Sequence, residues 1–339
     1  MLKEALLYKK LDNKKVQCLN CPHYCILSHK KRGVCGVKEN IDGKLYSLVY
    51  GKLIALHIDP IEKKPFFHFL PGSQSLSLAT AGCNLACLNC QNYNISQGPK
   101  NNGEIEGEDI FPQEIVEMAL EYKLPSISYT YTEPTVFLEY ALDVMKLAKD
   151  KSLKNNFVSN GFMTSEAAKL VIPYLDTINI DLKSFSDEFY QKNCRARLQP
   201  VLETAKLMKK SKVWVEITTL IIPTLNDSKE IFKKIAQFIF KELGAETPWH
   251  ISQFSGIISW KLQHLPETPI ETLQKAWEIG KKKGLKYVYT GNTPSLILKN
   301  TFCPKCNTLC INREGYTIQR FDKNGKCPNC SEDLNLILT

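Results

Sequence analysis

The chain has 339 residues, 43% of them hydrophobic, and its 44 Lys and Arg against 35 Asp and Glu give a formal net charge of +9. No apolar run approaches the roughly 20 residues of a transmembrane helix, which argues against a membrane protein. The N-terminus MLKEALLYKKLDNKK lacks the features of a secretory signal, so a cytoplasmic location with reduced thiols is expected. Lysine-rich runs such as KKSK are typical of solvated helix faces, so nucleic acid is not the expected partner.

Thirteen cysteines in a reducing compartment indicate metal or redox chemistry instead of a disulfide framework. Twelve of them are clustered near the N-terminus, after residue 80 and near the C-terminus, and only Cys194 is isolated. This distribution predicts a cysteine-rich metal-binding segment at 1–45, a central domain at 46–299 and a second metal-binding segment at 300–339. Both end segments are too short to build a core without a metal.

The N-terminal segment contains Cys18, Cys21, Cys25 and Cys35 at C-x2-C-x3-C-x9-C spacing. Four thiolates can hold either a zinc ion or an auxiliary [4Fe–4S] cluster, and His23 is an alternative ligand. Zinc is the preferred interpretation from the sequence. Folding of so short a segment should depend on its metal.

The central domain alternates short β-rich runs with stretches of helical periodicity. The expected strands are 75–81, 126–132, 155–161, 177–183, 213–222, 249–254 and 286–291, and the expected helices are 111–123, 134–151, 165–175, 201–211, 228–243 and 269–284. Such repetition predicts an α/β fold with a parallel sheet. A full or partial (β/α) barrel is favoured over a doubly wound sheet because glycine-rich phosphate loops are absent from the sequence. Functional side chains should then lie at the carboxyl ends of the strands.

Three cysteines, Cys83, Cys87 and Cys90, follow the first expected strand at C-x3-C-x2-C spacing. Zinc would need a fourth ligand, and the nearest candidate, His68, lies 15 residues upstream of Cys83. Three thiolates can hold three irons of a [4Fe–4S] cluster and leave the fourth iron open to a small molecule. The spacing therefore favours an iron–sulfur cluster at which chemistry occurs.

The C-terminal segment carries two C-P-x-C knuckles, Cys303 to Cys306 and Cys327 to Cys330, separated by 20 residues. This pattern predicts a tetrahedral zinc ribbon. Rubredoxin-type iron is the alternative, because iron accepts the same four-thiolate geometry. Cys310 is then surplus.

The central triad resembles that of the radical S-adenosylmethionine (SAM) superfamily, in which SAM binds the open iron. The resemblance covers nearly the whole chain. It extends through HIDPIEKKPFFHFLPGS, GCNLACLNCQNYNIS, YTYTEPTVFLEY, VSNGF, NIDLKSFSDEFY, CRARLQPVLET, VWVEITTLIIPTLNDS and YVYTGNTP. Together these motifs resemble the AmmeMemoRadiSam-system radical SAM enzymes, which are relatives of the pyruvate formate-lyase activating enzymes. The resemblance implies a partial (β/α) barrel, an oxidoreductase activity, a [4Fe–4S] cluster held by the triad, SAM and an external one-electron donor.

The resemblance also implies roles for polar residues that follow the strands. Glu133 would hold the methionyl amine of SAM, although a helix N-terminus also favours a carboxylate. Asn160 would lie near the ribose or the methionyl carboxylate, although Asn-Gly is also a turn signal. Lys183 would act on the SAM carboxylate and Asp181 would help to bind a monovalent cation, with a structural ion pair as the alternative.

Three further residues have weaker assignments. His250 would line the adenosine or substrate pocket, and a hydrogen-bonded structural histidine is an equal alternative. Asn89 stands where the family usually carries an aromatic residue near the adenine, so this contact would pass to Tyr93 or to the backbone. Cys194 is by default a core thiol, and on the catalytic face it would donate hydrogen to a radical intermediate or anchor it.

The leading functional hypothesis is reductive cleavage of SAM to a 5′-deoxyadenosyl radical, which abstracts hydrogen from an unidentified substrate. The substrate would be a small molecule, handled together with the other two proteins of the AmmeMemoRadiSam system, or a glycine in a partner protein. The alternative is a zinc-stabilised nucleic-acid-binding or RNA-modifying protein. Simple nucleic-acid binding is disfavoured because the end segments lack dense Arg and base-stacking aromatics, and because it leaves the triad unexplained.

Overall fold

A nine-stranded sheet organises the chain in the computed structural model, which describes residues 1–293 and 297–338. The strand order is β15-β14-β13-β12-β11-β10-β8-β7-β9, with parallel pairing from β15 to β8 and antiparallel pairing of β7 with β8 and β9. The strands are β7 (Lys52–Pro60), β8 (Gln74–Thr80), β9 (Glu108–Asp109), β10 (Ser126–Tyr129), β11 (Lys154–Ser159), β12 (Thr177–Asp181), β13 (Trp214–Ile221), β14 (Trp249–Gln253) and β15 (Val288–Gly291). Within the described residues the two end strands do not pair with each other, so the barrel is partial. The predicted α/β partial barrel is confirmed.

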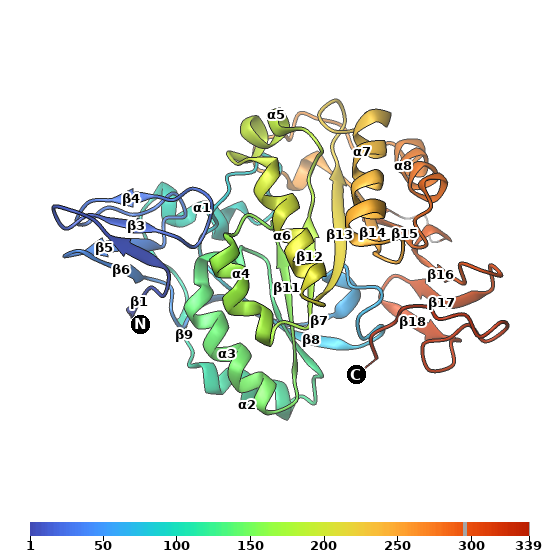
Figure 1. Ribbon diagram of the computed structural model, residues 1–339, viewed down its shortest axis with the longest axis horizontal. Helices are drawn as coiled ribbons and strands as arrows, with labels where there is room; N and C mark the ends of the chain where they lie inside the picture. The colour runs from blue at the N-terminus through green and yellow to red at the C-terminus, as the bar shows by residue number, and fades with distance from the viewer. Residues whose placement is uncertain (294–296, 339) are drawn as a thin grey trace.

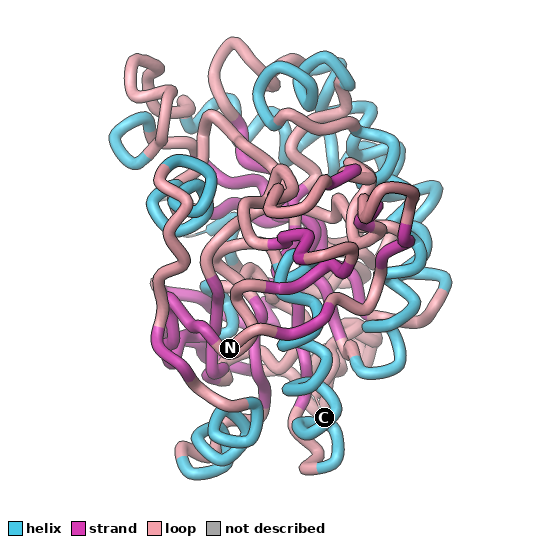
Figure 2. Tube along the Cα trace, turned by 90° about the vertical axis from the view of Figure 1, so that its left-hand side faces the viewer, coloured by secondary structure: helices cyan, strands magenta, loops and turns pink. Residues whose placement is uncertain are grey.

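Helices cover the outer side of this sheet (Figure 2). They are α1 (Tyr93–Asn101), α2 (Pro112–Glu121), α3 (Leu138–Asp150), α4 (Ser165–Val171), α5 (Asp187–Phe189), α6 (Leu198–Lys210), α7 (Lys229–Phe238) and α8 (Ile270–Lys283). Local chemistry sets several of their starts: the Thr164 hydroxyl accepts from the N–H of Ala167, and the Ser228 hydroxyl from that of Ile231. None of the described helices has the length and apolar character required to cross a membrane.

Each strand and helix predicted in the central domain overlaps an observed element, with differences only at the ends. Four strands and α-helices of this domain were not predicted: β7, α1 and the short β9 and α5. Strand β7 is amphipathic and antiparallel, so it does not follow the strand–helix repeat. Helix α1 contains Gly98 and Pro99, residues that disfavour a helix in the sequence. Pro294, which ends the motif YVYTGNTP, lies outside the described residues.

The two cysteine-rich end segments lie on opposite sides of the barrel (Figure 1). The N-terminal segment forms two small sheets, from β1 (Lys3–Glu4), β5 (Lys38–Ile41) and β6 (Lys44–Ser47), and from β2 (Tyr8–Lys10), β3 (Val16–Cys18) and β4 (Ile26–Leu27). The C-terminal segment forms one sheet, from β16 (Thr301–Phe302), β17 (Leu309–Glu314) and β18 (Thr317–Arg320).

A loop that precedes β8 enters the barrel near the amino ends of its strands. The backbone N–H groups of Phe67 and His68 both donate to the buried carboxylate of Glu216 on β13, at 3.0 Å each. Arg313, from the C-terminal segment, donates to the carbonyl of Phe67 at 2.9 Å and lies 4.2 Å from the centre of its ring. The C-terminal segment is therefore docked at the end of the barrel opposite to the carboxyl ends of the strands.

Candidate active site

The cysteine triad occupies the loop that follows β8, at the carboxyl ends of the parallel strands. This loop begins at Gly82, whose φ is +97°. A Cβ at that position would lie 2.6 Å from a methyl carbon of Val37 and 3.0 Å from the carbonyl oxygen of Cys35. Only glycine satisfies both the backbone angle and the close approach of the N-terminal segment.

Backbone hydrogen bonds from two other loops hold the triad loop in place. The N–H groups of Ala86 and Leu88 donate to the carbonyls of Cys194 and Asn193, at 3.0 and 2.8 Å. From the loop after β14, the N–H of Trp260 donates to the carbonyl of Cys90 at 3.1 Å. The triad is thus positioned by residues that are more than 100 positions away in the sequence.

The environment of the triad favours neutral thiols unless a cation is present. Burial raises the pKa of Cys83 and of Cys90. For Cys87, a hydrogen bond with the Cys194 thiol and then burial raise the pKa well above its ordinary value. Because thiolates are the metal-binding form, positive charge from a bound metal would have to offset these effects.

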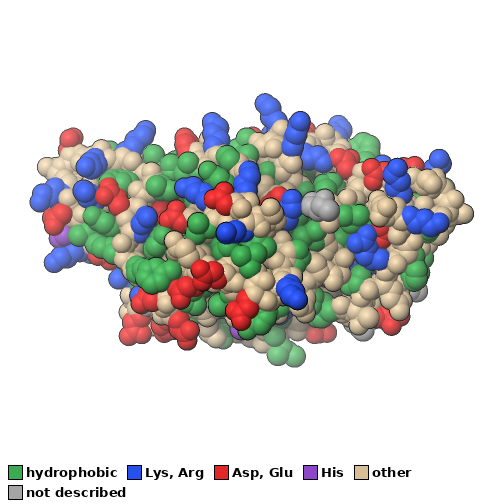
Figure 3. Space-filling model, turned by 90° about the horizontal axis from the view of Figure 1, so that it is seen from below, with side chains coloured by type: hydrophobic (Ala, Val, Ile, Leu, Met, Phe, Trp, Pro, Cys, Tyr) green, Lys and Arg blue, Asp and Glu red, His purple; other side chains and the backbone are tan. Residues whose placement is uncertain are grey.

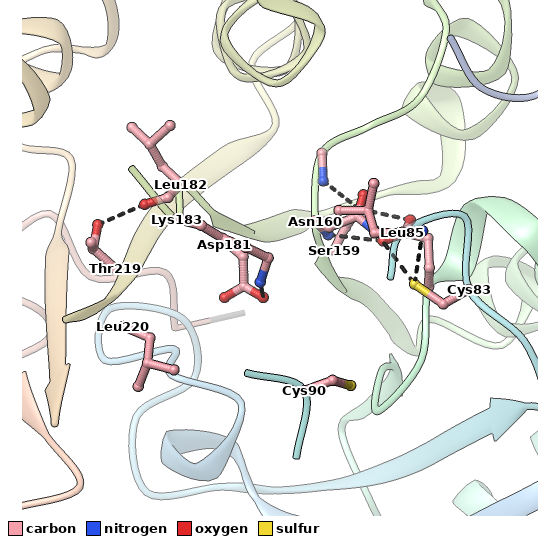
Figure 4. A network of polar contacts seen from close by, with 12 residues as sticks. Cys83, Leu85, Cys90, Ser159, Asn160, Asp181, Leu182, Lys183, Thr219 and Leu220 are labelled. Atoms are coloured by element: carbon pink, nitrogen blue, oxygen red, sulfur yellow. Dashed lines mark hydrogen bonds and ion pairs between the residues drawn. The ribbon is translucent and has the colours of Figure 1, made fainter. Parts of the chain in front are cut away.

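An ion pair between Asp181 and Lys183 faces the triad (Figure 4). Lys183 Nζ lies 2.9 Å from a carboxylate oxygen of Asp181, and the two side chains are 15% and 37% exposed. Burial by itself lowers the pKa of Lys183, but the Asp181 carboxylate and the thiols of Cys87 and Cys194 outweigh it and raise that pKa well above its ordinary value. A protonated Lys183 therefore lies beside the thiols, with one carboxylate as partner.

Four hydrogen bonds from its own chain hold Glu133 in place. It follows β10, is 1% exposed, and accepts hydrogen bonds from the Thr135 N–H and hydroxyl, the Ser159 hydroxyl and the Asn160 N–H. Three of these four bonds go to Oε1, and Oε2 accepts one, at 2.8 Å. Burial raises the pKa of Glu133, whereas the same donors lower it. Oε2 is the atom with lone-pair capacity left for a ligand amine.

Asn160 joins the end of β11 to the triad loop. Its Nδ2 donates to Asn84 Oδ1 at 2.8 Å and lies 3.7 Å from Cys83 Sγ (Figure 4). Asn84 in turn donates to the Phe162 carbonyl at 2.7 Å, and its own carbonyl lies 2.8 Å from His23 Nε2. The sequence reasoning missed Asn84. Its position directly after a cluster cysteine was the available signal.

Asn89 and Tyr93 lie on the far side of the triad loop. Asn89 Oδ1 is buried without a hydrogen-bond partner within the described chain. The Tyr93 ring stacks on Trp260, with ring centres 6.3 Å apart and planes at 13°. Trp260 belongs to the loop after β14, and the sequence did not predict this aromatic pair.

Cys194 lies beside the triad. It ends the π-helical turn Tyr190–Cys194 that follows α5, is fully buried, and lies close enough to Cys87 for its thiol to raise the pKa of Cys87. Its thiol therefore contacts a predicted cluster ligand.

His250 lies away from the triad, near the amino end of β14. Its Nε2 lies 2.6 Å from a carboxylate oxygen of Glu216, and its ring packs edge-on against Phe67 with centres 4.8 Å apart. These contacts belong to the loop that closes the amino end of the barrel. They give no support to a role of His250 in cofactor binding.

The two end segments arrange their cysteines differently. In the C-terminal segment the thiols of Cys303, Cys306, Cys327 and Cys330 all lie within 4.8 Å of one another, as a single metal ion requires. Cys310 is outside this group and its thiol contacts the Thr308 carbonyl. In the N-terminal segment the thiols of Cys18, Cys21, Cys25 and Cys35 surround a common cavity, and His23 is not among its lining residues.

Comparisons with known proteins agree with this arrangement. Residues 77–239 match the Radical SAM superfamily. The chain is 46% identical over 340 residues to the uncharacterized protein MJ0808 of Methanocaldococcus jannaschii, covering 99% of this chain and all of that protein. It is 23% identical over 164 residues to a pyruvate formate-lyase-activating enzyme of Clostridium pasteurianum, covering 47% of this chain and 66% of that enzyme.

The fold is also shared with a solved structure. A radical SAM methyltransferase from Sphaerobacter thermophilus superposes with a TM-score of 0.50 at 11% identity, covering 91% of this chain and 81% of that one. The triad at the carboxyl end of β8, the mostly parallel sheet and these matches lead to one conclusion. The chain belongs to the radical SAM superfamily.

Proposed function

We propose that this protein is an enzyme that cleaves SAM reductively and uses the resulting radical to abstract hydrogen from a substrate. The observation that carries the proposal is the juxtaposition of Cys83, Cys87 and Cys90 with the Asp181–Lys183 pair at the carboxyl ends of the strands. Thiols supply ligands for iron, and a lysine supplies a cation for the carboxylate of SAM.

The residues present fit a [4Fe–4S] cluster with SAM. Among the described residues, the triad thiols do not converge within 4.8 Å, as they would around one ion, and each is free to bind a different iron. The buried Asn89 Oδ1, which has no hydrogen-bond partner among the described residues, is an acceptor suited to an adenine amino group. When bound, the cluster and SAM together would supply a 5′-deoxyadenosyl radical by one-electron cleavage of the sulfonium.

The side chains of the protein would bind SAM and orient it. Lys183 would pair with the methionyl carboxylate, and Glu133 Oε2 would accept from the methionyl amine. The N–H of Asn160 and the hydroxyl of Ser159 fix the Glu133 carboxylate, so little reorganisation would accompany binding. The Trp260–Tyr93 stack would cover the triad loop and exclude water from it.

The substrate would be a glycine in a partner protein or a small molecule. Similarity to an activating enzyme supports the first class, and the motifs resembling the AmmeMemoRadiSam-system enzymes support the second, with the other two proteins of that system as partners. An external protein would donate the single electron in either case.

Nucleic-acid binding is the weaker candidate. On the face seen in Figure 3, Lys and Arg side chains are interspersed with Asp and Glu and do not form a continuous basic strip. A phosphate backbone is bound through such strips.

The test is production of 5′-deoxyadenosine from SAM by the anaerobically reconstituted protein with a strong reductant. Wild type should form it, and Cys310→Ala, which removes a thiol outside the triad, should form it at a similar rate. The triple variant Cys83→Ala, Cys87→Ala and Cys90→Ala should fall to the level of the reaction without enzyme.

Binding of SAM provides a second readout that needs no substrate. SAM should change the electron paramagnetic resonance (EPR) spectrum of the reduced wild-type protein, because it binds at an iron. A spectrum unchanged by SAM, together with no 5′-deoxyadenosine from a protein with its full iron and sulfide complement, would overturn the proposal.

A further inference from the structure

The spacing of the C-terminal thiols provides a reference for a single-ion site. Cys303 and Cys330 have their sulfurs 3.5 Å apart, and so do Cys306 and Cys327. Zinc–sulfur bonds of about 2.3 Å in a tetrahedron place the sulfurs about 3.8 Å apart. All four sulfurs lie within 4.8 Å of one another. This segment is therefore shaped for one ion.

The N-terminal thiols do not have this spacing. Among residues 1–293 and 297–338, no three ligand atoms from Cys18, Cys21, Cys25 and Cys35 lie within 4.8 Å of one another. The four cysteines nevertheless lie together, because all of them line one cavity. The four sulfurs are near neighbours, but they are too far apart for one zinc ion.

A cavity of about 20 Å³ separates these thiols. All four cysteines line it, together with Asn20, Gly33, Val34, Lys38, Asn84, Thr135 and Val136. A Cβ added to Gly33 would lie 3.6 Å from Cys25 Sγ and 3.8 Å from Cys35 Sγ, so the backbone here approaches two of the sulfurs. A space of this size holds about one water molecule, so the cavity marks the point that the four cysteines surround and not the volume of an occupant.

The surroundings also suit a negatively charged metal–thiolate centre. Lys38 lines the cavity, is 2% exposed and forms a buried ion pair with Glu139. Its ammonium group is a cation at the edge of the cavity and would offset part of the negative charge of a metal–thiolate centre.

We propose that Cys18, Cys21, Cys25 and Cys35 hold a second iron–sulfur cluster of the [4Fe–4S] type, and not zinc. Each thiolate of such a cluster binds a different iron, so the inorganic core spaces the ligands more widely than one ion does. All four cysteines line one cavity, and the wide spacing of their sulfurs favours a cluster over the zinc that the sequence preferred. The inference goes beyond SAM cleavage and does not depend on it.

The second cluster would lie beside the first. Asn84 lines the cavity and directly follows Cys83 of the catalytic triad. Gly82, which begins the triad loop, packs against the carbonyl of Cys35. Two reduced clusters this close should interact magnetically.

The experiment is a metal count on the full chain after anaerobic reconstitution with iron, sulfide and zinc. Wild type should contain about eight irons, about eight sulfides and one zinc, as two [4Fe–4S] clusters and one ribbon require. The variant Cys83→Ala, Cys87→Ala and Cys90→Ala, which leaves the N-terminal segment intact, should keep about four irons. The matched variant Cys303→Ser and Cys306→Ser should lose zinc and keep all the iron.

Other metal contents contradict the proposal of a second cluster. About four irons with two zincs in wild type, or a triad variant without iron, would overturn it, and about six irons would overturn the four-iron assignment. A protein that holds two zinc ions and still forms 5′-deoxyadenosine would refute the second cluster and leave the proposed function intact. A protein with about eight irons that neither binds nor cleaves SAM would refute the proposed function alone.

Discussion

The two end segments carry four clustered cysteines each, but they meet the barrel at opposite ends and in different ways. The N-terminal segment packs on the carboxyl ends of the strands, where the Thr164 N–H donates to the Asn20 carbonyl and His23 contacts the Asn84 carbonyl. The C-terminal segment docks at the amino ends, through Arg313 and Phe67. Among the described residues of the two segments, only those of the N-terminal segment contact the triad loop.

The difference shows that a cysteine pattern alone does not specify a metal centre. Both segments contain C-x2-C pairs, which bring two thiols to one ion or cluster. The distance to the remaining thiols depends on how the intervening chain folds. In the C-terminal segment the knuckles converge, whereas in the N-terminal segment the barrel side chains Thr135 and Val136 help to enclose a cavity between the thiols.

Loss of zinc should have the largest effect, and it should be confined to one segment. The double variant Cys327→Ser and Cys330→Ser should lose the ion and unfold residues 300–338, since structural zinc supplies about 10–16 kcal/mol of apparent binding free energy in small domains. Hydrogen exchange of the β17 amides should accelerate by orders of magnitude, while β10 to β12 stay protected. The control Cys310→Ala should keep its zinc. Full protection of β17 without zinc would show that Arg313 docking alone holds the segment.

The buried ion pair between Lys38 and Glu139 should give the next largest effect. In Lys38→Met the Glu139 carboxylate would stay buried with only the Leu6 N–H, at 3.1 Å, as donor. An unpaired buried charge costs about 3–5 kcal/mol of unfolding free energy, measurable by urea denaturation. Replacing both partners, as in Lys38→Met with Glu139→Leu, should recover much of this loss.

A surface pair provides the matched control for that measurement. Lys192 and Glu188 are 74% and 72% exposed, so Lys192→Met should cost less than about 1 kcal/mol. Equal costs for Lys38→Met and Lys192→Met would mean that the N-terminal segment opens readily from the barrel.

Acid should lower the unfolding free energy through His68, at the amino end of the barrel, by less than the loss of the Lys38–Glu139 pair does. Burial lowers the pKa of His68 to about 4, whereas an unfolded histidine has a pKa of about 6.5. Between these two pKa values the unfolded chain binds a proton at His68 and the native chain does not. The contribution of His68 to the unfolding free energy is therefore complete above the unfolded pKa and falls as the pH drops toward 4. Between pH 7 and pH 5 we expect a loss of about 2 kcal/mol in unfolding free energy.

The variant His68→Gln tests the assignment of that pH dependence. It should unfold with a shallower dependence between pH 7 and pH 5 than wild type, whatever its absolute stability. Identical slopes for the two proteins would place the titrating group elsewhere. His23, whose pKa is also lowered by burial, contacts Asn84 at the N-terminal interface and would be the next group to replace.

Much of the fold was predictable because its signals are local. The alternation of strands and helices from residue 75 onward reads directly from hydrophobic periodicity, and the observed elements overlap the predicted ones. The longer exceptions are β7, which pairs antiparallel outside the strand–helix repeat, and α1, which contains a glycine and a proline. The short elements β9 and α5 were also not predicted.

The candidate site was predictable to a smaller extent. Cys83, Cys87 and Cys90 stand out by spacing, and Asp181 and Lys183 by their place at the end of a strand. The position of His250 was misleading, because its side chain meets Glu216 in the amino half of the barrel. A strand sequence shows which residues share a face, but not which end of the barrel a side chain serves.

The sequence by itself determined the fold class, the superfamily and the set of thiols available to metals, since these follow from periodicity and short spacings. The tertiary structure decided that Glu133 is held by Ser159 and Asn160, and that Cys194 contacts Cys87. It also decided how far apart the four N-terminal thiols lie. These features depend on contacts between residues that are distant in the chain, and such contacts leave no local pattern in the sequence.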